Sequence, residues 1–523
     1  MAYSYSNLDN KLKNWFKNDD TCASLHNIQL KGRIRSLKDI DIAFEYPISV
    51  IAGKNGCGKT TILALAACAY HNNAKAFKMK SKKGSYYTFS DFFIQTQEEI
   101  KHDGIAVEYQ FLHNNWKGHH PGLGLQRMIK RSGGKWSKYD KRIKKNVLYL
   151  GIERVVPQTE KQVYKTYIKY FTDSIDDGWY QDVQKYVGRI LGKSYSDFKI
   201  KKAGGYNLQL VTETKITYSG FNMGAGERAL FELFSIIHEC SKSTGQSLII
   251  IDEIELGLHE VAQRKLIEIL KEICQKHRIQ IICTTHAPAI IDSLPPEARF
   301  YVEKLGEETI VTKGISGDFA AGRLSDQNSN ELDIYVEDGL AVSLLSSTFN
   351  LDIRQRVGLI PVGSFTAVCR QLGASYKHPK LKEKSIAILD GDQRSELQNL
   401  INRIALDLEL STAVEKTKFR DWVKDKILFL PGNENPEKWI IRKSLTYIDK
   451  VFADLLGVKV ALLRQEMGVS LTQPTHEEFY YLANKFTLKE DSIINDLSRL
   501  VAKNDTVDLK KITSIIEGLL NKG

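Results

Sequence analysis

Two groups of residues in this sequence have types and spacing that suit phosphate and metal chemistry. The first is the glycine-rich run Gly53-Lys54-Asn55-Gly56-Cys57-Gly58-Lys59-Thr60-Thr61. Glycines let backbone N–H groups curl around phosphate oxygens, and a helix that starts at the end of the run adds its positive dipole end. We expect Lys59 to reach the β- and γ-phosphates of a nucleotide and the Thr60 hydroxyl to bind Mg²⁺. The other expected phosphate contacts are Asn55, Gly56, Gly58 and Thr61.

The second group consists of acidic residues that follow short apolar runs. Glu337 follows LDIYV, and Asp390 and Asp392 follow KSIAIL. Carboxylate oxygens at this spacing suit Mg²⁺ or Mn²⁺, which can activate water and stabilise a leaving oxygen. Glu437, shortly after KILFLP, is a further candidate for this site. The alternative is that these acids are solvated side chains at strand ends.

Three segments between these groups suit nucleotide hydrolysis. The apolar run 248–251 leads to Asp252, which we expect to hold the Mg²⁺ shell, and to Glu253, which we expect to polarise the attacking water. The run IQIICTT leads to His286, whose imidazole can contact the γ-phosphate. The segment NMGAGE opens an amphipathic helix, where backbone N–H groups again suit a phosphate. The expected contacts in that segment are Gly224, Gly226 and Glu227.

Strands and helices must bring these residues together. The residues before the glycine-rich run form a short apolar strand, and TTILALAACAY indicates a buried helix. After Asp326, the strand candidates LDIYV, VGLIPV, KSIAIL and KILFLP alternate with helical stretches such as GLAVSLLSSTF. Strands that alternate with helices imply a parallel sheet with its site at the strand C-termini. The predicted fold class is therefore α/β, with further helices in the last 70 residues.

The motifs of the first part together resemble the ABC ATPase family over roughly residues 26–300. The order is Walker A, signature, Walker B, a D-loop-like ELGLH and a switch histidine at His286. The resemblance implies that the protein binds ATP and Mg²⁺ and works as at least a homodimer, because one subunit's signature completes another subunit's ATP site. Gly224 stands where the family has a serine. Gln95 and Gln97 are both candidates for the glutamine loop.

The acidic strand ends resemble the Toprim domain of topoisomerases, primases and some nucleases. Its glutamate maps to Glu337 and its Asp-x-Asp to Asp390 and Asp392. An ABC ATPase followed by Toprim resembles the OLD (overcoming lysogenization defect) nucleases, which include Gabija-type and retron-associated effectors of antiphage defence. The resemblance implies an ATP-regulated, metal-dependent DNA endonuclease. In that family a lysine beyond the last acid assists cleavage, and Lys485 and Lys489 are both candidates here.

The motifs divide the chain into two expected domains. An ABC-type ATPase domain covers residues 1–325, and a Toprim-like nuclease domain with C-terminal helices covers 326–523. Within the first domain, the tyrosine-rich stretch at about 155–205 indicates a helical insertion. The segment 113–146 carries ten basic residues and one acid, interleaved with Trp116 and Trp136. It predicts a phosphate-binding surface, for which a solvated basic hairpin is the alternative. The expected phosphate contacts in this segment are Lys130, Arg131, Lys141 and Arg142.

Charge and composition agree with a nucleic-acid partner. Residues 331–523 carry 27 basic and 27 acidic residues, so the first 330 carry the whole net charge of +11. No apolar run approaches the roughly 18 residues that a membrane span needs, and MAYSYSNLDNKLKNWF is not a signal peptide. The seven cysteines show no CxxC spacing and indicate reduced thiols of a cytoplasmic protein.

Two alternative functions keep the same fold. The chain can be a recombination-type ATPase clamp whose Toprim-like domain binds nucleic acid or a partner without cleaving it. It can also be a non-cleaving regulatory subunit held by a structured RNA, a single-stranded DNA or a partner protein. The sequence leaves the DNA substrate, the trigger and the direction of ATP control open.

Overall fold

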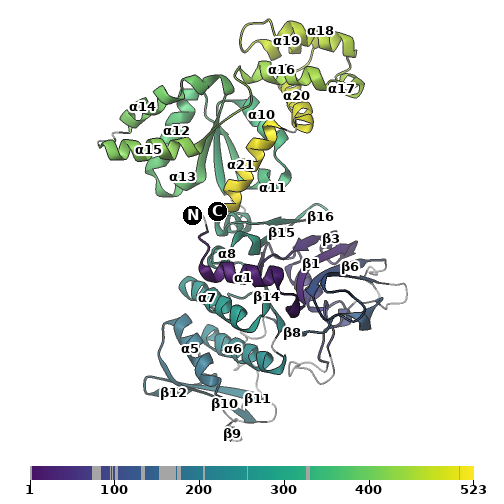
Figure 1. The fold of residues 1–523 in the computed structure, drawn as a ribbon, viewed down its shortest axis with the longest axis vertical. Coiled ribbons are helices and arrows are strands. Elements are labelled where there is room, and N and C mark those ends of the chain that lie inside the picture. The colour runs from purple at the N-terminus through teal and green to yellow at the C-terminus, as the bar shows by residue number, and fades with distance from the viewer. Residues whose placement is uncertain are drawn as a thin grey trace. The chain divides into compact units, whose positions relative to one another are not determined.

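The computed structural model describes residues 3–72, 84–94, 96, 98–99, 104–130, 136–151, 172–173, 178–203, 206–244, 246–255, 257–325, 330–408, 410, 412–505 and 507–522. The chain divides into two compact units, Ala2–Asn328 and Ser329–Gly523. The sequence-based domain boundary, between residues 325 and 326, lies close to this division and stays a prediction. Each unit contains a parallel sheet with helices (Figure 1), so the predicted α/β class is confirmed.

A six-stranded sheet forms the centre of the first unit. Its strands are, in spatial order, β16 (Glu308–Lys313), β15 (Arg299–Leu305), β5 (Ile48–Ala52), β14 (Gln280–Thr284), β13 (Ser247–Ile251) and β8 (Asn146–Leu150). All neighbours are parallel except β16, which is antiparallel to β15. Every residue of β5, β13 and β14 is buried, as expected for strands covered on both faces.

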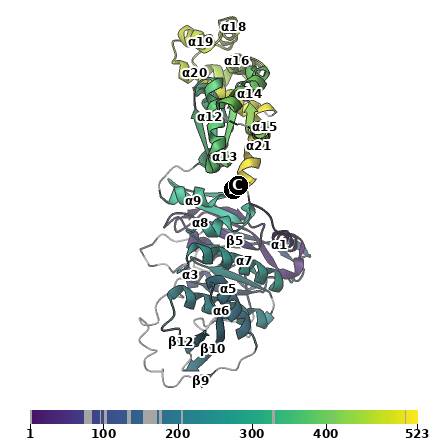
Figure 2. The same cartoon turned by 90° about the vertical axis from the view of Figure 1, so that its left-hand side faces the viewer.

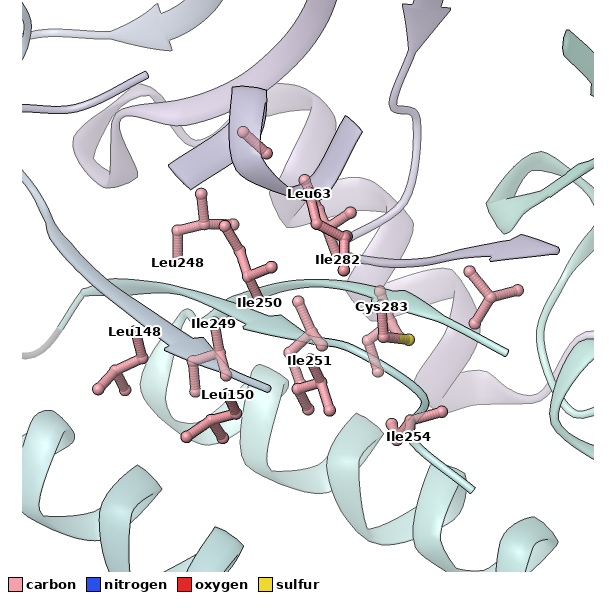
Figure 3. Close-up of a cluster of buried hydrophobic side chains, with 14 of the residues drawn as sticks. Leu63, Leu148, Leu150, Leu248, Ile249, Ile250, Ile251, Ile254, Ile282 and Cys283 are labelled. Carbon is pink, nitrogen blue, oxygen red and sulfur yellow. The ribbon is translucent and has the colours of Figure 1, made fainter. Parts of the chain in front are cut away.

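Aliphatic side chains from several elements pack around this sheet. Figure 3 shows Leu148 and Leu150 of β8 beside Ile249 and Ile251 of β13, with Leu63 of α2 (Lys59–Ala67) near Ile282. The helix α1 (Asn7–Asn18) packs on α7 (Glu260–His277), and α5 (Tyr180–Leu191) packs on both α6 (Ala225–Thr244) and α7 (Figure 1). The other helical elements of this unit are η1 (Asp20–Cys22), α3 (Phe89–Phe92), η2 (Tyr139–Lys141), α8 (Pro288–Asp292), η5 (Pro296–Ala298) and α9 (Gly317–Leu324).

Antiparallel strands complete the first unit. One sheet has the order β4 (Asp41–Ala43), β1 (Ser24–Lys31), β6 (Ala106–His113) and β7 (Gly122–Ile129). A second has the order β12 (Ile216–Ser219), β11 (Tyr206–Glu213), β10 (Tyr195–Ala203) and β9 (Thr172–Asp173), close to α5 and α6 in Figure 2. A small hairpin pairs β2 (Arg33–Ile34) with β3 (Leu37–Lys38).

The second antiparallel sheet corrects the prediction of a helical insertion at about 155–205. The stretch YQDVQKYVGRIL is a helix, α5, as expected. Residues 195–203 instead form strand β10, so the helical prediction is wrong for them. A bulge between Tyr195 and Asp197 shifts the register by one residue, which breaks the alternation expected of a strand. The stretch KQVYKTYIKYF lies outside the described residues.

The second unit is built on a four-stranded parallel sheet. Its spatial order is β18 (Val357–Pro361), β17 (Leu332–Val336), β19 (Ser385–Leu389) and β20 (Ile427–Phe429). Alternate residues of β19 enter different cores, because successive strand side chains point to opposite faces. Ile386 and Ile388 belong to one hydrophobic cluster, and Ala387 and Leu389 belong to the other.

Helices cover both faces of this sheet. Figure 1 shows α12 (Phe365–Lys377), α14 (Leu397–Asp407) and α15 (Ala413–Lys426) on one side and α10 (Gly339–Thr348), α11 (Leu351–Arg356) and α21 (Asp508–Lys522) on the other. The remaining helical elements are α13 (Pro379–Lys384), η6 (Gly391–Ser395), α16 (Pro436–Tyr447), α17 (Lys450–Leu455), α18 (Val460–Ser470), α19 (Glu478–Phe486) and α20 (Glu490–Asn504). The predicted helical C-terminal part is confirmed. Among the described residues, no helix combines the length and apolar character needed to cross a membrane.

Candidate functional site

The glycine-rich run connects β5 to α2, as predicted. Gly58 precedes the helix with φ +109°, a left-handed conformation that glycine adopts without a Cβ penalty. Lys59 is buried, and its Nζ donates to the carbonyl oxygens of Gly53 (2.7 Å) and Lys54 (3.1 Å). Burial lowers the pKa of Lys59, because it disfavours the charged form. A phosphate bound next to the ammonium would stabilise that charged form. Gly56 has φ +79°.

Two further members of the predicted phosphate set differ in exposure. Asn55 is exposed, whereas Thr61 is buried within the first turn of α2. Gln95 and Gln97, the candidates for the glutamine loop, lie outside the described residues.

Hydroxyl groups connect the glycine-rich run to the acidic pair after β13. The Thr60 hydroxyl donates to Asp252 Oδ2 at 3.1 Å, which places both predicted Mg²⁺ contacts side by side. The Thr284 hydroxyl donates to Asp252 Oδ1 at 2.6 Å and accepts the backbone N–H of Glu253 at 2.8 Å. Sequence reasoning missed Thr284, although its position at the end of a buried strand is a usable signal. The ends of β5, β14 and β13 therefore meet at one polar edge.

Glu253 and His286 lie at the same edge. Glu253 has φ +50°, a strained conformation for a residue with a side chain and one that is concentrated at functional sites. The backbone N–H of His286 donates to Glu255 Oε1 at 2.6 Å. Burial and then the charge of Lys59 lower the pKa of His286. The imidazole is therefore neutral near pH 7 and can donate a hydrogen bond or accept one.

The predicted signature begins helix α6, and its glycines allow a close backbone contact. A Cβ on Gly226 would lie 2.1 Å from the carbonyl oxygen of Gly257, in the loop after Glu253. Gly224 has open space around it. The signature loop and the loop after the acidic pair therefore touch within one chain.

Glu227, in the first turn of α6, is held by the antiparallel sheet. Its Oε1 accepts hydrogen bonds from the hydroxyls of Tyr195 and Tyr218 (2.8 Å for Tyr218) and from Lys193 Nζ at 3.2 Å. Lys193 also pairs with Glu213 at 3.0 Å. These three partners of Glu227 were not foreseen from the sequence, and two of them, Lys193 and Tyr195, come from the segment predicted to be helical.

The acidic residues of the second unit follow adjacent parallel strands. Glu337 directly follows β17 and Asp390 directly follows β19. The backbone N–H of Asp390 donates to Glu337 Oε1 at 3.0 Å, so the two strand ends are joined. Asp338 caps α10 by accepting the N–H of Ala341 at 2.9 Å. Glu337, Asp390, Asp392 and Glu437 are called the carboxylate cluster below.

The electrostatics of Asp390 reflect crowding by like charges. Burial, and then the negative charges of Glu337, Asp338, Asp392 and Glu437, raise the pKa of Asp390 to about 8. Burial also raises the pKa of Glu337. Asp390 is 9% exposed, and its Oδ1 is buried without a hydrogen-bond partner.

The turn between Asp390 and Asp392 packs closely on the loop after β20. A Cβ on Gly391 would lie 2.4 Å from the carbonyl oxygen of Gly432, so only glycine fits there. Arg394 donates to the carbonyl oxygen of Leu430 at 3.0 Å and stacks on Phe429. These contacts hold the turn at the sheet edge, with Asp392 exposed.

Glu437 lies in the first turn of α16, one loop beyond β20. It is 8% exposed, its Oε1 lies 2.8 Å from His476 Nδ1, and its Oε2 is buried without a partner. Of the lysine candidates, Lys485 pairs with Glu466 at 3.4 Å, and Lys489 directly precedes α20. The role of either lysine stays a prediction.

The carboxylate cluster has the donor chemistry of a hard divalent cation. The described residues contain no group of three or more His, Cys, Asp or Glu that could hold a metal ion as the side chains stand. The unpartnered oxygens of Asp390 and Glu437 and the raised pKa of Asp390 are nevertheless the properties that a cation would relieve. The residues therefore fit Mg²⁺ or Mn²⁺ in chemistry, with side-chain rotation still required.

The basic segment 113–146 combines structural and exposed side chains. Arg142 is buried and donates to the carbonyl oxygens of Cys68 (2.6 Å) and Tyr87 (3.0 Å), so its prediction as a phosphate contact is wrong. Lys145 is likewise buried and donates to Cys22. Arg131 lies outside the described residues. The exposed basic side chains of the described part include Lys117, Lys138, Lys141 and Lys144.

The two tryptophans of the basic segment are packed within the unit. Trp116 is buried, and its indole N–H donates to the carbonyl oxygen of Lys141 at 3.0 Å. Trp136 stacks on Phe89 with ring centroids 3.9 Å apart. Both rings therefore stabilise the unit.

Comparison with known proteins finds one matching family over part of the chain. Residues 135–292 match the family described as "AAA domain, putative AbiEii toxin, Type IV TA system". This segment includes Asp252, Glu253 and His286. The chain is also 24% identical over 301 residues to the Septu protein PtuA of Bacillus thuringiensis, a match that covers 50% of this chain and 71% of that protein.

Solved structures with similarity to the chain include heads of SMC proteins. The SMC head domain from Thermotoga maritima has 13% identity and a TM-score of 0.35, with 55% of this chain and 98% of that chain covered. The Smc head domain with an extended coiled coil, bound to the C-terminal domain of ScpA derived from Pyrococcus furiosus, has 13% identity and a TM-score of 0.38. That match covers 58% of this chain and 99% of that chain.

Proposed function

We propose that this protein is an ATP-regulated, divalent-metal-dependent DNA endonuclease that acts in antiphage defence. The observation that supports the nuclease part of the proposal is the environment of Asp390. Its buried carboxylate has an unpartnered oxygen and a raised pKa, and it lies beside Glu337 at the C-terminal edge of a parallel sheet. Placing several acidic side chains close together does not stabilise a fold, whereas a cation site requires several carboxylates close together. The order of an ATPase followed by this sheet resembles that of OLD nucleases.

Glu337, Asp390 and Asp392 would hold the metal ion, with Glu437 as a fourth carboxylate. The bound ion would supply an activated water and would stabilise the leaving oxygen of the phosphodiester. The backbone N–H of Asp390 fixes one oxygen of Glu337, which limits how that side chain can rotate. The packing of Gly391 on Gly432 keeps Asp390 and Asp392 on one rigid turn. The protein would therefore contribute negative charge that binds the ion and a rigid backbone that fixes where the ion lies.

The nucleotide half of the proposal assigns roles to the first unit. Lys59 and the glycine-rich run would bind the phosphates of ATP, and Thr60 and Asp252 would hold Mg²⁺. Glu253 would polarise the water, with His286 at the γ-phosphate. The signature residues Gly224, Gly226 and Glu227 would face the ATP of a second copy, so at least a homodimer is expected. The net positive charge of this unit favours DNA as the partner.

Plasmid cleavage by the purified protein tests the nuclease half. Wild-type protein should cut DNA with Mg²⁺ or Mn²⁺, with a chelator abolishing the reaction. Asp390→Ala should cut nothing and should turn over ATP at the wild-type rate. Asp454→Ala is the matched control, because Asp454 is an exposed acid of the same unit, in α17. Cleavage that persists in Asp390→Ala would place the nuclease elsewhere.

ATP binding and turnover test the nucleotide half separately. Lys59→Ala should abolish ATP binding, because the buried ammonium is the main phosphate partner. Glu253→Gln should bind ATP normally and hydrolyse it about 10²–10⁴-fold more slowly, the typical value of a general base. A normal rate of hydrolysis in Glu253→Gln would remove Glu253 from this role.

A non-cleaving function is the second candidate. It is favoured by one observation, that the described residues contain no ready-made group of three metal ligands. In that case the second unit would bind nucleic acid or a partner protein, and the chain would act as an ATPase clamp or a regulatory subunit. Tight DNA binding without cleavage under every metal would support it. Structured RNA or single-stranded DNA that co-purifies with the protein would favour the regulatory form.

A further inference from the structure

We propose that His476 is a positioning residue for the cation site, and that it acts by holding Glu437 in place. This inference rests on the proposed nuclease function. His476 lies in the loop between α18 and α19, and its Nδ1 is 2.8 Å from Glu437 Oε1 at the start of α16. The His476 side chain is 69% exposed, whereas the Glu437 side chain is 11% exposed. The histidine therefore covers the solvent side of a carboxylate that faces inward.

The two oxygens of Glu437 have different surroundings. His476 occupies Oε1, while Oε2 is buried without a hydrogen-bond partner. The charge of Glu437 acts on Asp390, which has its own unpartnered oxygen. A buried, unpaired carboxylate oxygen costs free energy unless something binds it. One oxygen of Glu437 is thus fixed by the protein, and the other is left for a cation shared with Asp390.

Repulsion explains why Glu437 needs such a partner. In the absence of a cation, a carboxylate placed beside other acids is disfavoured, and a glutamate in the first turn of a helix can rotate towards water. A hydrogen bond from Nδ1–H to Oε1 opposes that rotation. The same arrangement, in which a histidine and a carboxylate orient each other beside a metal, is a common outer-shell device.

The loop that carries His476 is anchored independently of Glu437. The fully buried Glu478 accepts a hydrogen bond from Asn435 Nδ2 at 3.2 Å and pairs with Lys438 Nζ at 3.5 Å. These contacts join the start of α19 to the start of α16. His476 itself has φ +73°, a strained conformation that the surrounding contacts must maintain. The imidazole is therefore held by contacts that do not involve Glu437, and it can fix the position of the Glu437 side chain.

Three substitutions of His476 separate a positioning role from a structural one. In asparagine the side-chain nitrogen lies the same number of bonds from Cα as Nδ1, and asparagine tolerates positive φ. In glutamine the nitrogen lies one bond further out. His476→Asn should therefore keep the hydrogen bond to Glu437, and His476→Gln and His476→Ala should lose it.

The measurement is Mn²⁺ binding to the full chain without nucleotide, followed by electron paramagnetic resonance. His476→Ala and His476→Gln should bind Mn²⁺ about 10–100-fold more weakly than wild type, the usual cost of losing an outer-shell partner. His476→Asn should bind within about threefold of wild type. Adding His476→Ala to Glu437→Ala should cause no further loss, because the histidine acts only through that carboxylate.

The possible failures are distinguishable. If wild-type protein binds Mn²⁺ and all three His476 variants bind it equally well, the positioning role is overturned and the nuclease proposal stands. Equal weakening in His476→Asn and His476→Ala would also overturn it, because the Nδ1 hydrogen bond would then not be the cause. If wild-type protein neither binds Mn²⁺ nor cleaves DNA, both the proposed function and this inference fail.

Discussion

Thr284 lies between the two acidic residues of the predicted nucleotide site. Its hydroxyl donates to Asp252 Oδ1 and accepts the N–H of Glu253. One side chain of β14 thereby fixes the carboxylate expected to hold Mg²⁺ and the strained backbone of the residue expected to polarise water. A hydroxyl that serves as both donor and acceptor is needed for this, which an apolar side chain of the same shape cannot replace.

Thr284→Val should slow ATP turnover while ATP binding remains. The substitution removes the acceptor of the Glu253 N–H and one of the hydrogen bonds to Asp252, so we expect turnover to fall about tenfold, or ~1.4 kcal/mol in the barrier. Thr284→Ser keeps the hydroxyl and is the matched control, which should retain most of the rate. The measurement is steady-state phosphate release together with nucleotide affinity. Equal rates in Thr284→Val and wild type would mean that Asp252 and Glu253 are positioned by other contacts.

The raised pKa of Asp390 predicts how the second unit responds to pH. Its folded-state pKa of about 8 lies above the ordinary 3.8, so between these values the folded protein keeps a proton that the unfolded chain releases. Stability should therefore fall as pH rises from about 4 to about 8. In chelator, Asp390→Asn should flatten this fall and raise the melting temperature at pH 8. Mg²⁺ should raise the melting temperature of the wild type at pH 8 more than that of the variant.

Asp454→Asn controls for the loss of one negative charge in the same unit, and it should leave the pH dependence unchanged. An identical fall in Asp390→Asn and wild type would show that crowding at Asp390 is not the cause.

At the scale of elements, the antiparallel sheet β9–β12 of the first unit is joined through Glu227 to α6, the helix that the predicted signature opens. Lys193, just after α5, Tyr195 on β10 and Tyr218 on β12 all bond to this carboxylate. A negative charge at a helix N-terminus competes with any phosphate that binds there. Lys193 offsets that charge, which makes the N-terminus of α6 more favourable for an anion.

Lys193→Gln should weaken ATP-driven pairing of two copies without changing ATP affinity in the monomer. The glycine-rich run is unaffected, but Glu227 loses its cationic partner where the second copy's γ-phosphate is proposed to bind. Lys199→Gln is the matched control, because Lys199 lies on β10 and pairs only loosely with Asp197 at 3.6 Å. Sedimentation with and without ATP measures the effect. Equal dimer formation by the two variants would contradict this role of Lys193.

The success of sequence reasoning differed between kinds of element. Parallel strands such as β13 and β19 are buried on both faces, so each appears as a short apolar run that ends at an acid. Asp252 and Asp390 could therefore be placed from the sequence. Strand β10 could not, because its bulge makes the buried residues Tyr195, Phe198 and Ile200 fall at uneven spacing. The partners Thr284 and His476 were also missed, because hydrogen bonds between distant segments leave no local pattern.

At the scale of the whole molecule, charge is divided between the two units. The first 330 residues carry the entire net charge of +11, while the remainder is neutral. Nucleic acid is therefore expected to be held mainly by the first unit, and the carboxylate cluster would act on DNA that another surface has captured. The burial of Arg142 and Lys145 reduces the number of basic residues available for that surface.

The exposed lysines of residues 136–146 can be used to test whether the first unit binds DNA. Replacing Lys138, Lys141 and Lys144 by glutamine should weaken DNA binding equally for unrelated sequences, because phosphate contacts carry no sequence information. If all three lysines bind phosphates, the slope of log affinity against log salt should become shallower by about 0.9 for each lysine replaced. Replacing the exposed Lys11, Lys17 and Lys304 instead removes the same charge from other parts of the unit. The slope should become shallower in the first triple variant and not in the second. Equal slopes would mean that residues 136–146 are a solvated basic surface that contributes only its share of the net charge.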